Sequence, residues 1–310
     1  MIYDSSDIVA AQEHFGFASP RPIEKDCHVL LAMRAIASVD ATPFRLVFAG
    51  GTCLARAHKL IRRMSEDVDF KVTPLDFGQA SKNKTRRDLG DLRDRFTASL
   101  QDAGFEIDPT DSSQLRSRDQ NRHTIFQLTY EEPEQTTESL RPTIQVELNY
   151  AVVRSPTVSL PVASFVAEAF GRPPEVTSIA CASITETAAE KLVSLTRRTA
   201  MELAGVYRDP DPTLVRHIYD LHVTRAHYSS QQVALLAREI VPLDAEEFGN
   251  QFPSYRNNPE EETRRALAVL AADASYAQRY AQFLGLMVYG EKPAYEEALA
   301  TVQTLVGQLW

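Results

Sequence analysis

The sequence predicts an α+β fold in which an N-terminal α/β lobe, built on a mixed sheet, precedes an all-α C-terminal lobe. Short apolar or alternating runs typical of strands lie before residue 150, whereas apolar residues at helical spacing dominate after residue 185. Between these regions, a stretch without clear periodicity carries Pro156, Pro161, Pro173 and Pro174. We therefore expect residues 1–165 to form the α/β lobe and residues 166–310 to form the helical lobe.

Hydrophobic periodicity and turn residues predict the elements of the N-terminal lobe. In chain order they are a helix at 22–41, a strand at 44–49 ending in a tight turn at Gly50-Gly51, a helix from about Thr52 to Arg63 capped by Thr52, a strand at 68–72, a charged helix at 84–103, and strands at 104–108, 122–130 and 142–150, with a polar loop at 109–121.

The C-terminal lobe is expected to consist of helices alone. Their predicted ranges are 186–205, 211–226, 230–241, 260–273, 275–289 and 293–309, with Thr185 and Ser230 as caps. The chain has no apolar run long enough to cross a bilayer, and its acidic N-terminus does not resemble a signal peptide. We therefore expect a cytoplasmic protein without a membrane partner.

Charge and cysteine content limit the classes of function. The net charge of −9 argues against a protein whose whole surface binds nucleic acid, but it leaves room for a local basic groove. The three cysteines are far apart and lack metal-ligand spacing, so we expect reduced, buried thiols rather than a zinc site. Basic residues cluster at Arg56, Lys59, Arg62 and Arg63, at Lys82, Lys84, Arg86 and Arg87, at Arg116, Arg118 and Arg122, and at Arg197 and Arg198.

Two aspartates on one strand predict a metal site. Asp67 and Asp69 are two residues apart, so both side chains point to the same face of the strand. Two carboxylates this close repel one another unless a cation lies between them, and hard oxygen ligands suit Mg²⁺ or Mn²⁺. A turn at Gly50-Gly51 allows the backbone to approach a phosphate closely because glycine has no Cβ. The pattern predicts a phosphate-binding turn beside a metal clamp.

Glu147 is the candidate for a third metal ligand. It alternates with apolar residues along its predicted strand, and a neighbouring position in the sheet would place it beside Asp67. The alternative for Glu147 is an exposed strand carboxylate without a ligand. The same alternative, with less support from the pattern, applies to Asp67 and Asp69.

These residues carry a resemblance to a known family. The run from Gly50-Gly51-Thr52-Cys53-Leu54 to Arg63-Met64-Ser65-Glu66-Asp67-Val68-Asp69-Phe70 resembles the first motif of the AbiEii/MenT-type nucleotidyltransferase toxins, which belong to the DNA polymerase β-like superfamily. The spacing between Thr52 and Asp67 is about one residue longer than the family pattern. The strand of Glu147 resembles the second conserved strand of the family, and the resemblance implies a palm-like N-terminal lobe.

Two later motifs extend the resemblance. Residues 186–192 (ETAAEKL) are similar to a family helix whose lysine, here Lys191, contacts nucleotide phosphates. Residues 216–221 (RHIYDL) are similar to a motif whose last acidic residue, here Asp220, is functionally important. His217 replaces the usual acidic residue there, and an apparent insertion at 207–212 leaves open whether Arg208-Asp209 takes that role. Because Asp220 lies among apolar residues it needs a partner if buried, and Lys191 is the natural one.

The resemblance implies a toxin, paired with an antitoxin, that transfers NMP from an NTP to the 3′ end of tRNA and blocks translation. The implied catalytic residues are Asp67, Asp69, Lys191 and Asp220, with Asp67, Asp69 and Glu147 on the metal. The implied nucleotide-binding residues are Gly50, Gly51, Thr52, Ser65 and Lys191, and the candidate RNA or phosphate contacts are Arg63, Arg197 and Arg216.

Other functions stay open from sequence. The acceptor could be a protein or a small hydroxylated compound, the chain could bind NTP without chemistry, or the same cation could serve a hydrolase. A separate hypothesis concerns Ser65, which lies two residues before Asp67. A phosphate on Ser65 would place negative charge beside the cation and so switch the enzyme off; the alternative is a hydroxyl that only shapes the turn.

Overall fold

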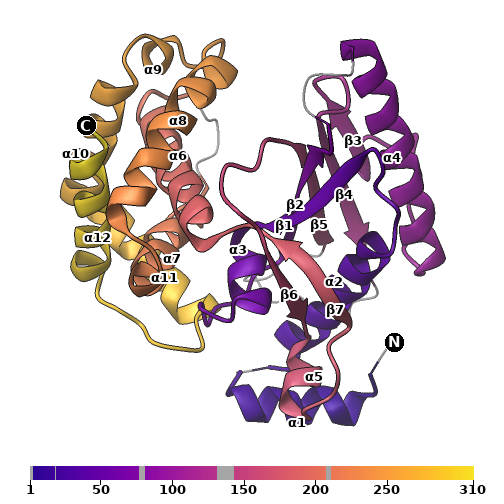
Figure 1. Cartoon of the computed structure of the whole chain (residues 1–310). Coiled ribbons are helices and arrows are strands. Elements are labelled where there is room, and N and C mark those ends of the chain that lie inside the picture. The colour runs from indigo at the N-terminus through magenta and orange to yellow at the C-terminus, as the bar shows by residue number, and fades with distance from the viewer. Residues whose placement is uncertain (1–2, 18, 77–80, 131–142, 207–210) are drawn as a thin grey trace. The chain divides into compact units, whose positions relative to one another are not determined.

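The computed structural model describes residues 3–17, 19–76, 81–130, 143–206 and 211–310 (Figure 1). The chain divides into two compact units, which we call unit 1 (residues 1–59 and 64–182) and unit 2 (residues 60–63 and 183–310). Unit 1 contains the sheet, and unit 2 is helical, so the predicted α+β class with a mixed sheet and a helical C-terminal region is confirmed. The alternative residues Arg208-Asp209 lie outside the described residues.

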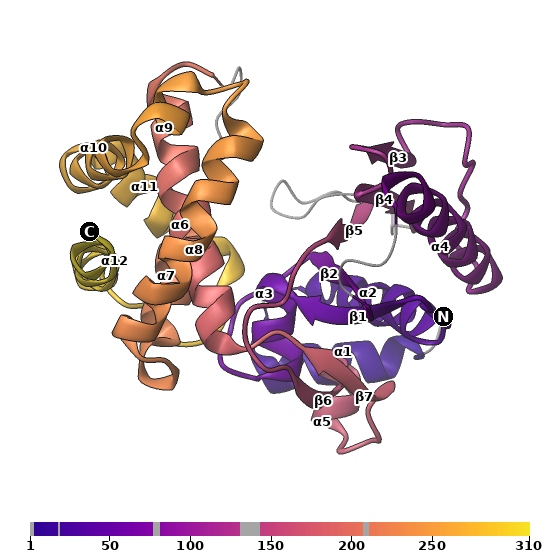
Figure 2. The same cartoon turned by 45° about the horizontal axis from the view of Figure 1, so that its top comes forward.

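The sheet of unit 1 has the strand order β3-β4-β5-β2-β1-β7-β6 (Figure 2). The β2–β5 and β1–β7 pairs are parallel and the remaining pairs are antiparallel, which makes the sheet mixed. The strands are β1 (Phe44–Ala49), β2 (Asp67–Pro74), β3 (Leu115–Arg118), β4 (His123–Thr129), β5 (Thr143–Tyr150), β6 (Val158–Val162) and β7 (Val176–Cys181).

The helices of unit 1 give the sheet its apolar core. They are α1 (Ser5–Phe15), α2 (Arg21–Ala37), α3 (Gly50–Thr52), which continues as the π-helix η1 (Cys53–Ala57), α4 (Lys82–Asp102) and α5 (Phe165–Ala169). Apolar residues of α2 and α4 pack against Val68, Phe70 and Val72 of β2 and their neighbours in β4 and β5. Because side chains alternate along a strand, the odd-numbered residues of β2, Asp67 and Asp69 among them, lie on the opposite face. We call this opposite face the carboxylate face.

Unit 2 consists of helices and one short segment from earlier in the chain. The helices are α6 (Ile184–Leu203), α7 (Arg216–Val223), η2 (Arg225–His227), α8 (Ser230–Phe248), α9 (Pro253–Asn257), α10 (Pro259–Ala272), α11 (Ala274–Met287) and α12 (Tyr295–Leu309). The segment Leu60–Arg63 joins them through a bridge between Arg63 and Val288 and a hydrogen bond from the Tyr289 N–H to the Arg62 carbonyl, 3.1 Å long. The described residues form no helix of the length and apolarity that a membrane span requires.

The structure corrects the predicted helix at 52–63. The helix begins at Gly50, changes to π geometry at Cys53 and ends at Ala57, shortly before Lys59 adopts a positive φ of 57°. Thr52 does not cap it, because its hydroxyl donates to the carbonyl of Asp67 instead. The predicted caps of later helices also shift: Ser183, not Thr185, caps α6, and the residue before α8 is Ser229.

The prediction of a strand at 104–108 and a loop at 109–121 was wrong. Phe105 and Ile107 are buried, but their segment has no strand partner and is fixed by a 2.8 Å hydrogen bond from the Gln101 side chain to the Ile107 carbonyl. Strand β3 lies inside the predicted loop and has only Leu115 buried. Unit 1 continues past the expected boundary at residue 165, because β7 lies between β1 and β6 in the sheet and pairs with both.

Candidate active site

The parallel pairing of β2 with β5 brings the predicted carboxylates together. Asp69 lies directly opposite Glu147, and Asp67 lies opposite Gln145. Residues opposite one another in a sheet point to the same face, and neighbouring strands are about 4.8 Å apart. Asp67, Asp69 and Glu147 therefore share the carboxylate face, as the alternation along each strand predicts, but the direct neighbour of Glu147 is Asp69 and not Asp67 as expected.

Gly50 makes the closest backbone approach to this group. Its φ is +73°, and a Cβ added to it would lie 1.9 Å from Asp69 Oδ2. Both the left-handed conformation and the contact require glycine. The turn that follows β1 thus leaves space for the Asp69 carboxylate, and a side chain at position 50 would occupy that space.

Side chains that flank Asp67 fix the start of β2. The Thr52 hydroxyl donates to the Asp67 carbonyl and lies 2.9 Å from the half-buried Ser65 hydroxyl, which ties the glycine turn to the strand. Glu66, the residue before Asp67, forms a buried ion pair with Lys25 of α2. Both contacts hold the backbone on which the aspartates are mounted.

Glu147 belongs to a polar chain that reaches the edge of the sheet. Its Oε2 lies 3.6 Å from His123 Nε2, and its other oxygen accepts a hydrogen bond from Gln145. Arg118 Nε donates to His123 Nδ1 over 2.9 Å, which leaves the ring proton on Nε2, the nitrogen facing Glu147. Burial opposes ionisation of Glu147, but His123 and the hydrogen-bonding amides outweigh it and lower the pKa of this carboxyl.

The donor set fits a hard divalent cation in type. Carboxylate oxygens on one face, with the Gly50 turn shaped around Asp69, are ligands of the kind that Mg²⁺ and Mn²⁺ prefer. Among the described residues, no group of three or more His, Cys, Asp or Glu side chains is gathered closely enough to hold a metal ion. Glu147 contacts His123 and Gln145 and lies opposite Asp69 in the register.

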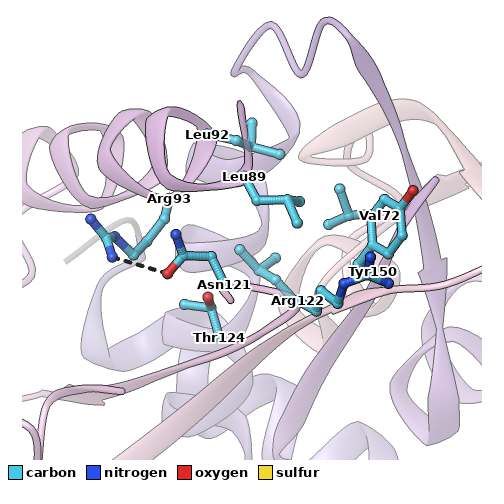
Figure 3. Close-up of a pocket in the computed structure, with 9 residues that line it drawn as sticks. Val72, Leu89, Leu92, Arg93, Asn121, Arg122, Thr124 and Tyr150 are labelled. Atoms are coloured by element: carbon cyan, nitrogen blue, oxygen red, sulfur yellow. Dashed lines mark hydrogen bonds between the residues drawn. The ribbon is translucent and has the colours of Figure 1, made fainter. Parts of the chain in front are cut away.

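Two cavities of unit 1 lie on the other side of the sheet. The smaller one has a volume of about 10 Å³, room for about one water, and lies between α4 and the sheet beside Val72, Leu89 and Tyr150 (Figure 3). The larger one, about 380 Å³, adjoins Pro74 and Tyr150 at the far ends of β2 and β5. Neither is lined by Asp67, Asp69 or Glu147, so neither is the site that these carboxylates define.

Unit 2 holds Lys191 and Asp220 in one buried cluster of charges. Lys191 Nζ lies 2.8 Å from Asp220 Oδ2, the pairing that the sequence predicts. Arg63 adds a two-pronged contact, with Nε 2.7 Å from Oδ1 and Nη2 2.8 Å from Oδ2 of Asp220. Asp220 is fully buried, and its acceptors are used by two cations.

The electrostatics of this cluster follow from burial and from the excess of cations. Burial would raise the pKa of Asp220, but Arg63 and Lys191 outweigh it and hold this pKa far below its usual range. Burial lowers the pKa of Lys191, and Arg63 adds to this effect while Asp220 opposes it. His217 lies close to the cluster, and burial together with Lys191 and Arg216 lowers its pKa well below the usual value, so it is neutral at pH 7.

The three candidate RNA contacts occupy different environments. Arg63 is buried on Asp220, as described above. Arg197 is also buried, with Nε 2.8 Å from Asp244 Oδ2 and its guanidinium 3.6 Å from the centre of the Phe248 ring. Arg216 is half-buried at the first turn of α7. Arg63 and Arg197 thus form ion pairs inside unit 2.

Sequence reasoning missed His123 and the structural role of Arg63. The alternation His123, Ile125, Gln127 along β4 carries the signal for His123, but only the pairing register shows that it neighbours Glu147. For Arg63, the sequence offers no signal that a residue so far from Asp220 in the chain becomes its partner.

Comparisons with known proteins agree with this architecture. A family model described as "Nucleotidyl transferase AbiEii toxin, Type IV TA system" matches residues 31–301. Among solved structures, the MenT4 nucleotidyltransferase toxin from Mycobacterium tuberculosis H37Rv is similar in fold, with a TM-score of 0.53 and 17% sequence identity over 97% of this chain and 89% of that chain. No curated protein matches the chain significantly.

Proposed function

The chain belongs to the family of AbiEii nucleotidyltransferase toxins of type IV toxin–antitoxin systems, and from that premise we propose that it transfers NMP from an NTP to the 3′ end of tRNA. Nucleotidyl transfer implies an NTP substrate, and a type IV toxin implies an antitoxin partner. Blocking the 3′ end of tRNA would stop aminoacylation and therefore translation, which gives the reaction its toxic effect in the cytoplasm.

The observation that carries this proposal is the position of Gly50 against Asp69 on the carboxylate face. A cation bound by Asp67, Asp69 and Glu147 would stabilise the charge on the attacking and leaving oxygens. The backbone turn at Gly50-Gly51 would receive the NTP phosphates, and the Thr52 hydroxyl keeps this turn beside Asp67. The oxygen of the acceptor hydroxyl attacks the α-phosphorus, and the new P–O bond forms as the P–O bond to pyrophosphate breaks. The hydroxyl proton passes to solvent or to a carboxylate.

Lys191 is assigned to the NTP phosphates by family resemblance. A compact ammonium group suits a phosphate as a point charge. Asp220, at 2.8 Å, holds the side chain in place, and Arg63 in turn fixes the orientation of the Asp220 carboxylate. We assign Asp220 a positioning role through Lys191 rather than direct contact with the substrate.

The test is nucleotide transfer with purified components. The protein is incubated with total tRNA, Mg²⁺ and each of four α-labelled NTPs in turn, and the RNA is resolved on a denaturing gel. We expect label on the 3′ end of tRNA with at least one NTP, loss of label with a chelator, and loss by several orders of magnitude in Asp69→Asn. If Asp69→Asn unfolds at the same temperature as wild type, its loss of transfer activity is not caused by a loss of fold.

The rival functions give different results in the same assay. Label on protein or on a small molecule, with none on RNA, would indicate another acceptor. Pyrophosphate release without any labelled acceptor would indicate a hydrolase. Binding of NTP with neither product would indicate a non-catalytic module, and it would overturn the proposal.

A further inference from the structure

The carboxylate face continues beyond Glu147 to the outer edge of the sheet. The pairing registers define a row of residues across four strands: Asp69 on β2 is opposite Glu147 on β5, which is opposite Ile125 on β4, which is opposite Arg116 on β3. Residues paired in this way all point to the same face. Arg116 therefore shares the face of Asp69, three strand spacings or about 14 Å away.

A second row runs beside the first and also ends in an arginine. It joins Lys71 on β2, Asn149 on β5, His123 on β4 and Arg118 on β3. Arg118 is linked to Glu147 through His123, by the 2.9 Å hydrogen bond and the 3.6 Å approach described above. The first row leads from Asp69 and Glu147 to the exposed Arg116, and the second reaches the exposed Arg118 through the residue that contacts Glu147.

From these two rows, the geometry points to Arg116 and Arg118 as binding residues for the sugar–phosphate backbone of the RNA acceptor, on the face that carries the catalytic carboxylates. This inference rests on the proposed function, since it assigns a binding surface to the RNA strand whose 3′ hydroxyl reacts. It also replaces Arg63 and Arg197, which are buried on Asp220 and Asp244, as the main candidates for RNA contact.

The chemistry of the face favours RNA over an acceptor of another class. A guanidinium presents five N–H donors in a fork that matches phosphate oxygens, and the bond to His123 uses only Nε of Arg118. On this face His123 lies between Glu147 and Arg118, and Ile125 lies between Glu147 and Arg116. The amides of Gln127 and Gln145 form the neighbouring row, and these polar groups suit riboses and base edges.

The main experiment compares two double variants in tRNA binding and transfer. In Arg116→Ala/Arg118→Ala we expect tRNA affinity to fall by about tenfold, and the slope of log affinity against log salt to become shallower by about 1.4, the value for two contacts to a single strand. The KM for NTP should not change in the single variant Arg116→Ala, which keeps the Arg118–His123 bond. The matched control is Arg86→Ala/Arg87→Ala, which removes the same charge from exposed positions on α4, the helix packed on the other face.

Two further variants separate phosphate binding from a disturbance of Glu147. Arg116→Ala alone leaves the Arg118–His123 bond intact, so it should raise the KM for tRNA by about threefold with kcat unchanged. Arg116→Lys/Arg118→Lys keeps the charge and should recover most of the salt slope. Equal tRNA affinity and equal salt slope in wild type and the Arg116→Ala/Arg118→Ala variant would overturn the inference, as would an equal loss in the α4 control.

The outcome is distinguishable from failure of the proposed function. If wild type labels tRNA and the arginine variants do so with the same KM, the function stands and the inference fails. If wild type labels no RNA, the proposed function fails. The inference is still decided in that case, because tRNA binding that depends on Arg116 and Arg118 supports it and binding that does not depend on them refutes it.

Discussion

Replacing Asp220 by asparagine should destabilise unit 2 strongly while changing its shape little. The carboxylate is completely buried and lies between Arg63, at 2.7 and 2.8 Å, and Lys191, at 2.8 Å. Asparagine has nearly the same volume but no charge. It removes the negative charge that Arg63 and Lys191 both contact in the interior of unit 2.

The magnitude follows from the cost of removing one partner of a buried ion pair. Removing one partner of a buried ion pair costs about 3–5 kcal/mol. Each kcal/mol lowers Tm by roughly 2–4 °C in a unit of this size, so Asp220→Asn should melt roughly 10 °C below wild type. Removing one cation as well, in Asp220→Asn/Lys191→Met, should recover part of the loss, because one of the two cations that faced the carboxylate is then gone.

Differential scanning calorimetry at pH 7 measures this effect, with Glu239→Gln on the exposed side of α8 as a control that should stay within about 2 °C of wild type. If Asp220→Asn also melted within that range, Asp220 would not be the counter-charge of this cluster. The same conclusion would follow if Asp220→Asn/Lys191→Met lost more stability than the sum of the losses measured for Asp220→Asn and for Lys191→Met.

The remaining predictions concern unit 1. Gly50→Ala should reduce nucleotide transfer as far as Asp69→Ala does, because its Cβ displaces that carboxylate, yet cost only about 1–2 kcal/mol in chemical denaturation; full activity would contradict this. In His123→Phe, roughly tenfold more Mg²⁺ should be needed to raise Tm by the same amount as in wild type. An unchanged Mg²⁺ titration would show that the imidazole does not support Glu147. Burial raises the pKa of Asp26 to about 6 although Arg56 opposes this, so the folded state holds the proton more tightly than the unfolded chain. The stability from this group is present below about pH 4 and is lost as the pH rises through 6, by up to about 3 kcal/mol, and Asp26→Asn should flatten urea-derived stability over that interval.

The elements that could be predicted from sequence are those with a long, regular pattern. Helices α2 and α4 and strands β1, β4 and β5 lie close to their expected ranges because each buries a repeating apolar face. The missed strands are β3, β6 and β7. Strands β3 and β6 lie at the two ends of the sheet and bury one residue each, and β7 buries residues at irregular spacing. The helix after Gly50 ends early because Lys59 leaves the helical region, which no periodicity reveals.

The candidate site divides in the same way. The face shared by Asp67 and Asp69 follows from their spacing alone, and a β-strand could be recognised around them. Their relation to Glu147 depends on the parallel pairing of β2 with β5, which is a long-range property of the fold. Contacts of a single side chain, such as Arg63 with Asp220, cannot be predicted without the fold, since many buried cations could have served this carboxylate.

The path of the chain through Leu60–Arg63 bears on how this protein can be divided. The helices of residues 183–310 receive four residues that come from between β1 and β2, and one of these is the arginine that neutralises Asp220. A C-terminal fragment that begins at Ser183 would lack that guanidinium and the main-chain partners of Val288 and Tyr289. We expect such a fragment to fold poorly when produced alone, and to regain order when a peptide carrying residues 60–63 is supplied in trans.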